Sequence, residues 1–202
     1  MKLRIIPKNR YSARVELDDI CRGTLPLKVL LPLYPVDFWG EVPDNAAAEL
    51  LKLLEKHACL LLMDYLAKAE HSEFQCRNLL KRRQFSPQII DSCISRCKEQ
   101  KYLDDARFAE VLIASYITRR ASRRAIIAKL REQRVPASIW EPLINELYQK
   151  NDQKQNLGEL MQKYCARHGS LETHKLKEKV FAYLYRKGFE LEDIRSAWET
   201  MD

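Results

Sequence analysis

A threefold internal repeat constrains this chain more than any other feature of its sequence. Three segments of equal length can be set under one another without gaps: CRNLLKRRQFSPQIIDSCI (76–94), IIAKLREQRVPASIWEPLI (126–144) and VFAYLYRKGFELEDIRSAW (180–198). Their shared anchor positions, Phe85, Val135 and Phe189, are 50 and then 54 residues apart. A period near 50 residues indicates a repeated supersecondary unit that buries its apolar face by stacking on its neighbours.

Each repeated segment reads as a helix, a short break and a second helix, because apolar residues recur at spacings of three and four. Ser86 and Pro87 suit a helix start, with a serine cap and a proline at the first helical position. Gly188 stands where the preceding helix should end in left-handed geometry. Gln84 and Arg134 hold the matching places in the first two segments and should adopt that conformation at some cost.

A third helix is expected before each pair, over residues 46–69, 104–120 and 152–168. Ser72 and Ser122 then open the following helices as N-caps. The sequence therefore predicts a mostly α-helical fold of three tandem three-helix repeats, which should form an elongated, curved array with one concave side. The expected repeats are residues 46–103, 104–150 and 151–202.

Residues 1–45 form a different element. The runs 2–6 and 11–17 partly alternate apolar and polar residues, and Pro7-Lys8-Asn9 and Asp18-Asp19 are candidate turns, so we predict a small N-terminal β-hairpin. Four prolines then exclude a long helix before residue 44. They are Pro26, Pro32, Pro35 and Pro43.

The composition limits the function classes. Only 5 glycines occur among 202 residues, and no phosphate-binding loop, nucleophile elbow or paired metal-binding histidines are present, so we expect a non-enzyme without a cofactor. No signal peptide or apolar run of membrane-spanning length occurs, which predicts a cytoplasmic protein without membrane contact. The third repeat is neutral and shows no apolar excess that would suit a dimer contact, which favours a monomer.

The cysteines are interpreted as structural rather than as metal ligands. Most lie among apolar neighbours at helical spacing, where a free cysteine behaves as a small hydrophobe. Cys93 and Cys97 are one helical turn apart, which is not a zinc-knuckle spacing. We therefore expect reduced thiols and no metal site, with retained zinc as the alternative.

The net charge of +7 is concentrated in the middle of the chain, which favours an acidic partner. From Val111 to Arg131 there is no acidic residue, although six basic residues fall in that stretch. A merely solvated helix usually mixes charges of both signs, so a contact surface is favoured over a solvated face. The candidate contacts in this stretch are Arg119, Arg120, Arg123, Arg124 and Arg131, and the first repeat adds Arg77, Lys81 and Arg82.

Two further interpretations concern this surface. Arg124 and Arg131 are seven residues apart and should share a helix face with Ala128 between them, beside a buried stripe at Ile126 and Leu130. The tryptophans could serve base stacking or the core. Trp140 and Trp198 occupy core positions of the repeat, whereas Trp39 is undetermined.

The string KYLDDARFAE at 101–110 has a structural explanation. Asp104 or Asp105 can cap a helix starting at Ala106, and the negative charge of either residue favours that helix end. Tyr102 and Leu103 should pack before the cap, while Phe108 points inward.

The same string, after EHSEFQCRNLLKRRQFS (70–86), resembles the RecX family of recombination regulators. The string RKGF at 186–189 extends the resemblance into the third repeat, and VELDD at 15–19 is similar to a short hairpin that many members carry. The resemblance covers nearly the whole chain. Members usually have glycine where Gln84 and Arg134 stand, and glutamate in place of Gln75.

The resemblance implies a three-repeat helical protein that binds the filament of the RecA recombinase on DNA and inhibits its ATPase and strand exchange. It implies no catalytic residues. Two other classes stay open: a general nucleic-acid-binding protein that acts independently of RecA, and a passive helical adaptor. The sequence leaves open whether the basic face meets DNA phosphates or an acidic protein surface.

Overall fold

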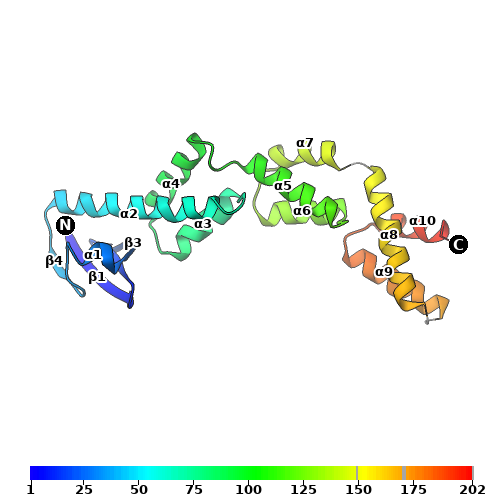
Figure 1. Cartoon of the computed structure of the whole chain (residues 1–202), viewed down its shortest axis with the longest axis horizontal. Coiled ribbons are helices and arrows are strands. Elements are labelled where there is room, and N and C mark those ends of the chain that lie inside the picture. The colour runs from blue at the N-terminus through cyan, green and yellow to red at the C-terminus, as the bar shows by residue number, and fades with distance from the viewer. Residues whose placement is uncertain (149, 170–171, 202) are drawn as a thin grey trace. The chain divides into compact units, whose positions relative to one another are not determined.

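The computed structural model describes residues 1–148, 150–169 and 172–201, and helices account for most of them (Figure 1). The chain divides into two compact units, Met1–Asp104 and Asp105–Asp202. Unit 1 holds a sheet and the first three-helix repeat, and unit 2 holds the second and third repeats. The predicted mostly α-helical fold with an N-terminal β element is confirmed.

The N-terminal element is larger than the predicted hairpin. Its antiparallel sheet has the strand order β3-β2-β1-β4. The strands are β1 (Lys2–Asn9), β2 (Ser12–Leu17), β3 (Ile20–Pro26) and β4 (Trp39–Glu41). Asp18 and Asp19 both have positive φ angles, 51° and 61°, so they form the predicted turn with the backbone twist that two-residue hairpins favour. The turn predicted at Pro7-Lys8-Asn9 is wrong, because these residues continue β1, which pairs with β2. β3 and β4 were not predicted, because β3 contains Gly23 and ends in a proline, and β4 is only 3 residues long.

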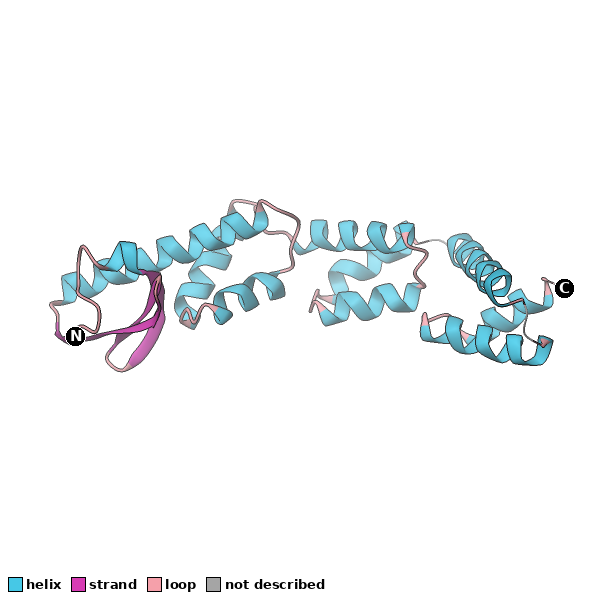
Figure 2. Cartoon of the chain, turned by 60° about the horizontal axis from the view of Figure 1, so that its bottom comes forward, coloured by secondary structure: helices cyan, strands magenta, loops and turns pink. Residues whose placement is uncertain are grey.

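The prolines after the sheet act as expected. The only helical segment between β3 and β4 in the described chain is α1 (Leu27–Leu30), which is one turn long. Pro43 then precedes α2 (Asp44–Leu66), the helix that lies against the sheet in both views (Figures 1 and 2). Leu50, Leu54 and Ala58 on α2 are almost fully buried, at the spacing of one helix face.

Unit 1 has one hydrophobic core that runs from the sheet into the first repeat. After α2 the repeat contains α3 (Glu73–Arg82) and α4 (Pro87–Glu99). Strand residues such as Leu3 and Val15 belong to the same buried cluster as Leu80 and Ile94 of the repeat. Residues 1–45 therefore share their core with the first repeat.

Unit 2 repeats the three-helix pattern twice. The second repeat is α5 (Asp105–Thr118), α6 (Arg123–Glu132) and α7 (Ala137–Leu147), and the third is α8 (Lys150–His168), α9 (Thr173–Arg186) and α10 (Leu191–Glu199). Trp140 and Trp198 are 4% and 6% exposed, so their predicted core role is confirmed. Trp39 is 72% exposed and belongs to none of the buried clusters of the described chain.

The helix breaks have the backbone that the alignment predicts. Gln84, Arg134 and Gly188 have φ angles of 64°, 54° and 87°, which places all three in the left-handed region. Each is followed by a buried anchor residue, Phe85, Val135 or Phe189. The left-handed residue ends one helix and turns the next side chain into the core.

The expected helix caps are partly right. The hydroxyl oxygens of Ser72 and Ser122 accept hydrogen bonds from the amides of Gln75 and Ala125, both at 3.2 Å. Ser86 stands at the N-cap position before Pro87, but its side chain makes no capping hydrogen bond. The predicted helix start at Ser86 and Pro87 is confirmed, and only the side-chain cap is absent. The Ser86 amide instead donates to the Arg22 carbonyl on β3, which anchors the residue to the sheet.

Candidate binding surface

The basic face of α6 is built by the same pattern that buries the opposite face. Ile126 and Leu130 are fully buried in the core of the second repeat. Arg124, Ala128 and Arg131 are exposed, so the shared face expected for the two arginines is present. The helix thus fixes both guanidinium groups on one side through its own packing.

A groove of about 440 Å³ follows this face, and it is called the α6 groove here. Its walls come from the second and third repeats, which both belong to unit 2. Its lining residues are Arg123, Arg124, Ile127, Ala128, Arg131, Gln153, Gly188 and Glu190. Three arginines and one glutamate give it a basic character, while Ala128 and Gly188 leave room for a partner to approach.

The arginines of the α6 groove are positioned but only weakly neutralised. Arg124 is 3.7 Å from the Glu190 carboxylate and lies 5.7 Å from the ring centre of Tyr185. Arg131 lies 5.7 Å from the ring centre of Trp140 and makes no ion pair with any described residue. Contacts with aromatic faces orient a guanidinium while leaving its hydrogen-bond donors available.

Arg123 is held more firmly. Its guanidinium donates a hydrogen bond to the Asn145 side-chain oxygen on α7. Its Nε atom is buried and has no hydrogen-bond partner among the described residues. Arg123 lines the α6 groove, but its buried Nε atom is not open to a partner there.

The wall of the α6 groove is formed by a close contact between repeats two and three. The Ser122 hydroxyl donates a hydrogen bond of 3.0 Å to the Lys187 carbonyl, while its oxygen caps α6. A Cβ atom on Gly188 would lie 2.6 Å from the Ser122 Oγ atom. The glycine is needed there both for its positive φ angle and for the close approach.

Two of the predicted contact residues, Arg77 and Arg120, form ion pairs with carboxylates of this chain. Arg120 pairs with the Glu159 carboxylate on α8 at 2.5 Å, and this hydrogen bond lowers the pKa of Glu159. Arg77 pairs with Glu73 at 2.6 Å and with Asp91 at 2.5 Å. The hydrogen bonds from Arg77 to Asp91 and Glu73 raise the pKa of Arg77 further.

The network around Arg77 also includes Lys98, which pairs with the same Glu73 carboxylate. Partial burial alone would raise the pKa of Glu73, but the hydrogen bonds from Lys98 and Arg77 outweigh it and the pKa lies below its ordinary value. Arg77 therefore ties α3 to α4 within the first repeat.

The other predicted contacts are exposed. Lys81, Arg82 and Arg119 make no ion pair with any residue that the structure describes. Lys81 and Arg82 belong to unit 1, and Arg119 belongs to unit 2. Their predicted use by a partner stays a prediction.

The string at 101–110 has a mixed outcome. Leu103 and Phe108 are 3% and 7% exposed and belong to the cores of their units. Tyr102 is 48% exposed, so it packs less completely than expected. The helix begins at Asp105 rather than Ala106, which leaves Asp104 directly before it.

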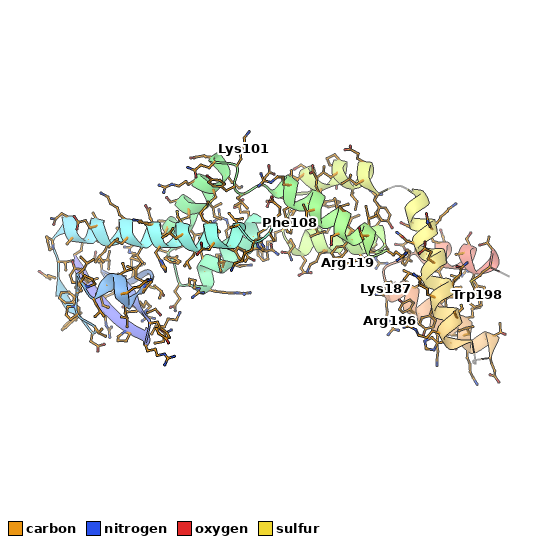
Figure 3. The ribbon with its side chains drawn as sticks, in the orientation of Figure 1. Lys101, Phe108, Arg119, Arg186, Lys187 and Trp198 are labelled. Carbon is orange, nitrogen blue, oxygen red and sulfur yellow. The ribbon has the colours of Figure 1, made fainter. Side chains whose placement is uncertain are left out.

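Sequence reasoning missed the basic turn after α9. Figure 3 labels Arg119 after the end of α5 and Arg186 and Lys187 around the end of α9. The Ser122–Lys187 hydrogen bond joins the start of α6 to the end of α9. Arg186 and Lys187 are exposed. The signal was available in the RKGF string, since a left-handed glycine turn presents the residues before it at the surface.

The α6 groove suits a partner that carries phosphate or carboxylate groups, because the planar guanidinium of arginine matches both. A membrane-spanning segment is a separate question. No helix in the described part of the chain is long and apolar enough to cross a bilayer.

The comparisons with known proteins agree across the helical part of the chain. Models of the first, second and third three-helix domains of RecX match residues 61–97, 104–141 and 151–198. The chain is 30% identical to the regulatory protein RecX of Chlorobium phaeobacteroides (strain BS1) over 149 residues, which cover 73% of this chain and 93% of that protein.

Further relatives and solved structures point the same way. The regulatory protein RecX of Syntrophotalea carbinolica (strain DSM 2380 / NBRC 103641 / GraBd1) is 32% identical over 126 residues, covering 61% of this chain and 82% of that protein. A crystal structure of regulatory protein RecX matches with a TM-score of 0.68 at 17% identity, over 98% of this chain and 99% of that one, which shows a shared fold. The chain belongs to the RecX family of regulatory proteins.

Proposed function

We propose that this chain regulates homologous recombination and DNA repair by binding the RecA–DNA filament and inhibiting the ATPase and strand-exchange activities of RecA. The observation that carries the proposal is membership of the RecX family across all three helical domains. The α6 groove supports it, because its lining places three arginines against a single acidic residue. The protein acts in this role by binding, without a catalytic step.

Arg123, Arg124 and Arg131 are the proposed principal contacts. Arg124 and Arg131 are exposed, and aromatic rings orient them without neutralising them. A planar guanidinium binds phosphate or carboxylate through two parallel hydrogen bonds, so either class of acidic partner fits.

The remaining basic residues divide into two groups. Lys81, Arg82 and Arg119 are exposed and serve as additional contacts in this proposal. Arg77 and Arg120 are assigned to structure instead, because each already holds a carboxylate at 2.6 Å or less. Replacing either would disturb a helix contact as well as remove charge.

The test is the rate of ATP hydrolysis by RecA on single-stranded DNA, measured with increasing amounts of this protein. The wild type should lower the rate. The double reversal Arg124→Glu with Arg131→Glu should raise the concentration needed for half inhibition by about tenfold or more, equivalent to about 1.4 kcal/mol. An unchanged ATPase rate at saturating wild-type protein contradicts the proposal.

The matched control is Lys179→Glu with Arg195→Glu. It makes the same change in net charge on exposed residues of unit 2, and neither residue lines the α6 groove. The control should inhibit like the wild type. Both double variants should unfold within about 0.5 kcal/mol of the wild type per substitution, since surface changes rarely cost more.

A second candidate is a nucleic-acid-binding role that needs no RecA. The exposed arginines of the α6 groove favour it, because a basic surface binds phosphates of any sequence. In that case the protein alone should bind DNA with a strong salt dependence, and each lost phosphate contact should lower the salt slope by about 0.9. Weak DNA binding alone together with RecA inhibition favours the first proposal.

A further inference from the structure

Two thiols from different helices of unit 1 lie within bonding reach of each other. The Sγ atoms of Cys59 on α2 and Cys93 on α4 are 3.0 Å apart. A disulfide requires about 2.05 Å, so the sulfurs need to approach by only about 1 Å. All six cysteines lie in the described part of the chain, and no disulfide joins any two of them.

The two sulfurs differ in access. Cys93 is fully buried, and its own thiol lies 3.7 Å from the Glu55 carbonyl oxygen. Cys59 is only partly buried on the edge of the same core, which makes it the more accessible of the two. Burial raises the pKa of Cys93 and also that of Cys97, which keeps both inner sulfurs as thiols.

We propose that Cys59 and Cys93 form a modification site, at which a peroxide converts the two thiols into a disulfide that joins α2 to α4. The accessible Cys59 reacts first and the buried Cys93 resolves it. A metal is not the ligand in this proposal, since the described residues contain no group of three or more side chains able to hold one.

The chemistry balances in two steps. The Cys59 sulfur attacks one peroxide oxygen, the O–O bond breaks, and a sulfenic acid and one water form. The Cys93 sulfur then attacks the Cys59 sulfur, the S–O bond breaks, and the hydroxyl leaves as a second water with the Cys93 proton. The two thiols together lose two protons and two electrons, and one peroxide becomes two waters.

The bond would close a loop between helices that are already packed. Cys59 and Cys93 are 34 residues apart. Closing a loop of this size restricts the unfolded chain, and because the folded backbone needs little movement, the thermal midpoint should rise by on the order of 10 °C.

The experiment uses the full, reduced chain treated with hydrogen peroxide, followed by alkylation of the remaining thiols and mass spectrometry of the digested protein. Alkylatable thiols should fall from six to four, with one linked peptide pair containing Cys59 and Cys93. Circular dichroism should show the higher thermal midpoint, and a reductant should reverse it. Six remaining thiols, or a link through any other cysteine, overturns the proposal.

Two variants and one condition sharpen the result. Cys59→Ser should keep all of its thiols alkylatable after the same treatment. Cys165→Ser is the matched control, since Cys165 is also partly buried, and burial raises its pKa, but it lies in unit 2; this variant should still form the Cys59–Cys93 link. The wild type unfolded in urea should lose the selectivity for this pair. The same yield of this link in the unfolded chain overturns the role assigned to the packed helices.

Discussion

Unit 1 and unit 2 pack the same kind of left-handed turn against different surfaces. In unit 1 the turn between α3 and α4 contacts the sheet: the Cys21 thiol donates to the Gln84 carbonyl at 3.4 Å, and Lys8 donates to the Gln84 side chain at 3.1 Å. In unit 2 the turn between α9 and α10 contacts the start of α6, through the hydrogen bond from Ser122 to Lys187.

Each of the two contacts needs a glycine. In unit 1 the glycine lies on the sheet that receives the turn, and in unit 2 it lies in the turn itself. On Gly23 of the sheet, a Cβ atom would lie 2.6 Å from the Phe85 ring, whereas the turn itself keeps Gln84. On Gly188 of the other turn, a Cβ atom would lie 2.6 Å from the Ser122 hydroxyl, whereas the receiving helix keeps its capping serine. A close approach of this kind needs a glycine on one of the two surfaces, and the glycine can lie on either one.

This comparison explains why Gln84 can stand where relatives are expected to have glycine. Its side chain is exposed and accepts the hydrogen bond from Lys8, so the turn requires only a positive φ angle there. At Gly188 the positive φ angle would strain a side chain, and the close contact with Ser122 leaves no room for one.

The largest effect is expected for Gly188→Val. The variant forces a branched residue into the left-handed region and against Ser122, whose hydroxyl is fixed by two hydrogen bonds. We expect a loss of about 3 kcal/mol in the free energy of unfolding, measured with urea. Gly158→Ala is the control: apart from its chain neighbours and the backbone of α8 itself, no atom lies within 4 Å of the new Cβ, so it should stabilise the protein by about 0.5–1 kcal/mol. Equal changes in the free energy of unfolding at both glycines would show that the contact with Ser122 is not what requires Gly188.

A smaller loss, about 2 kcal/mol, is expected for Gly23→Ala. The new Cβ would press on the side chains of Phe85 and Leu54, at 2.6 Å and 2.9 Å, and these can shift more readily than a fixed cap. Adding Phe85→Leu should recover part of the loss, and the urea unfolding of both single variants and the double variant gives the coupling. Strictly additive losses would contradict the proposed contact.

An effect below about 1 kcal/mol is expected for Glu73→Gln, which removes the carboxylate that pairs with Arg77 and Lys98 in unit 1. The lowered pKa of Glu73 means that its charged form stabilises the fold above the ordinary glutamate pKa. That contribution should be lost as the pH falls through the lower, folded-state pKa. Between pH 7 and about pH 3, the free energy of unfolding measured with urea should therefore fall less for Glu73→Gln than for the wild type. The difference is small, because the carboxylate is partly exposed. An identical pH dependence would remove Glu73 from this role.

The smallest effect is expected for Gln84→Gly, a gain of about 0.5 kcal/mol. Glycine relieves the left-handed strain but loses the exposed contact with Lys8 and adds freedom to the unfolded chain. Gln84→Ala is the control, because it removes the same contact and keeps the strain, so it should not be stabilising. Urea unfolding of the two variants separates conformation from contact. A destabilised Gln84→Gly would show that the side chain matters more than the turn.

Much of the fold followed from local patterns. The anchors Phe85, Val135 and Phe189 predicted the three turns, and the alternating run at 11–17 predicted β2. The shared face of Arg124 and Arg131 was also predictable, because helix geometry alone relates residues seven apart. The strand β3 was not predicted, because a glycine such as Gly23 usually indicates a break in a strand. The reason for the glycine, the Phe85 ring that packs on it, is visible only in the fold.

Spacing along the chain was enough to predict the repeat, its helices, the left-handed turns and the basic face of α6, because each of these is a local property of the backbone. The packing of whole helices was needed to learn which arginines stay available to a partner and which thiols lie together. Arg120 meets Glu159 and Cys59 meets Cys93 across 39 and 34 residues of sequence. Side-chain periodicity within one helix carries no information about such a distant neighbour, because that neighbour is chosen only when the helices pack.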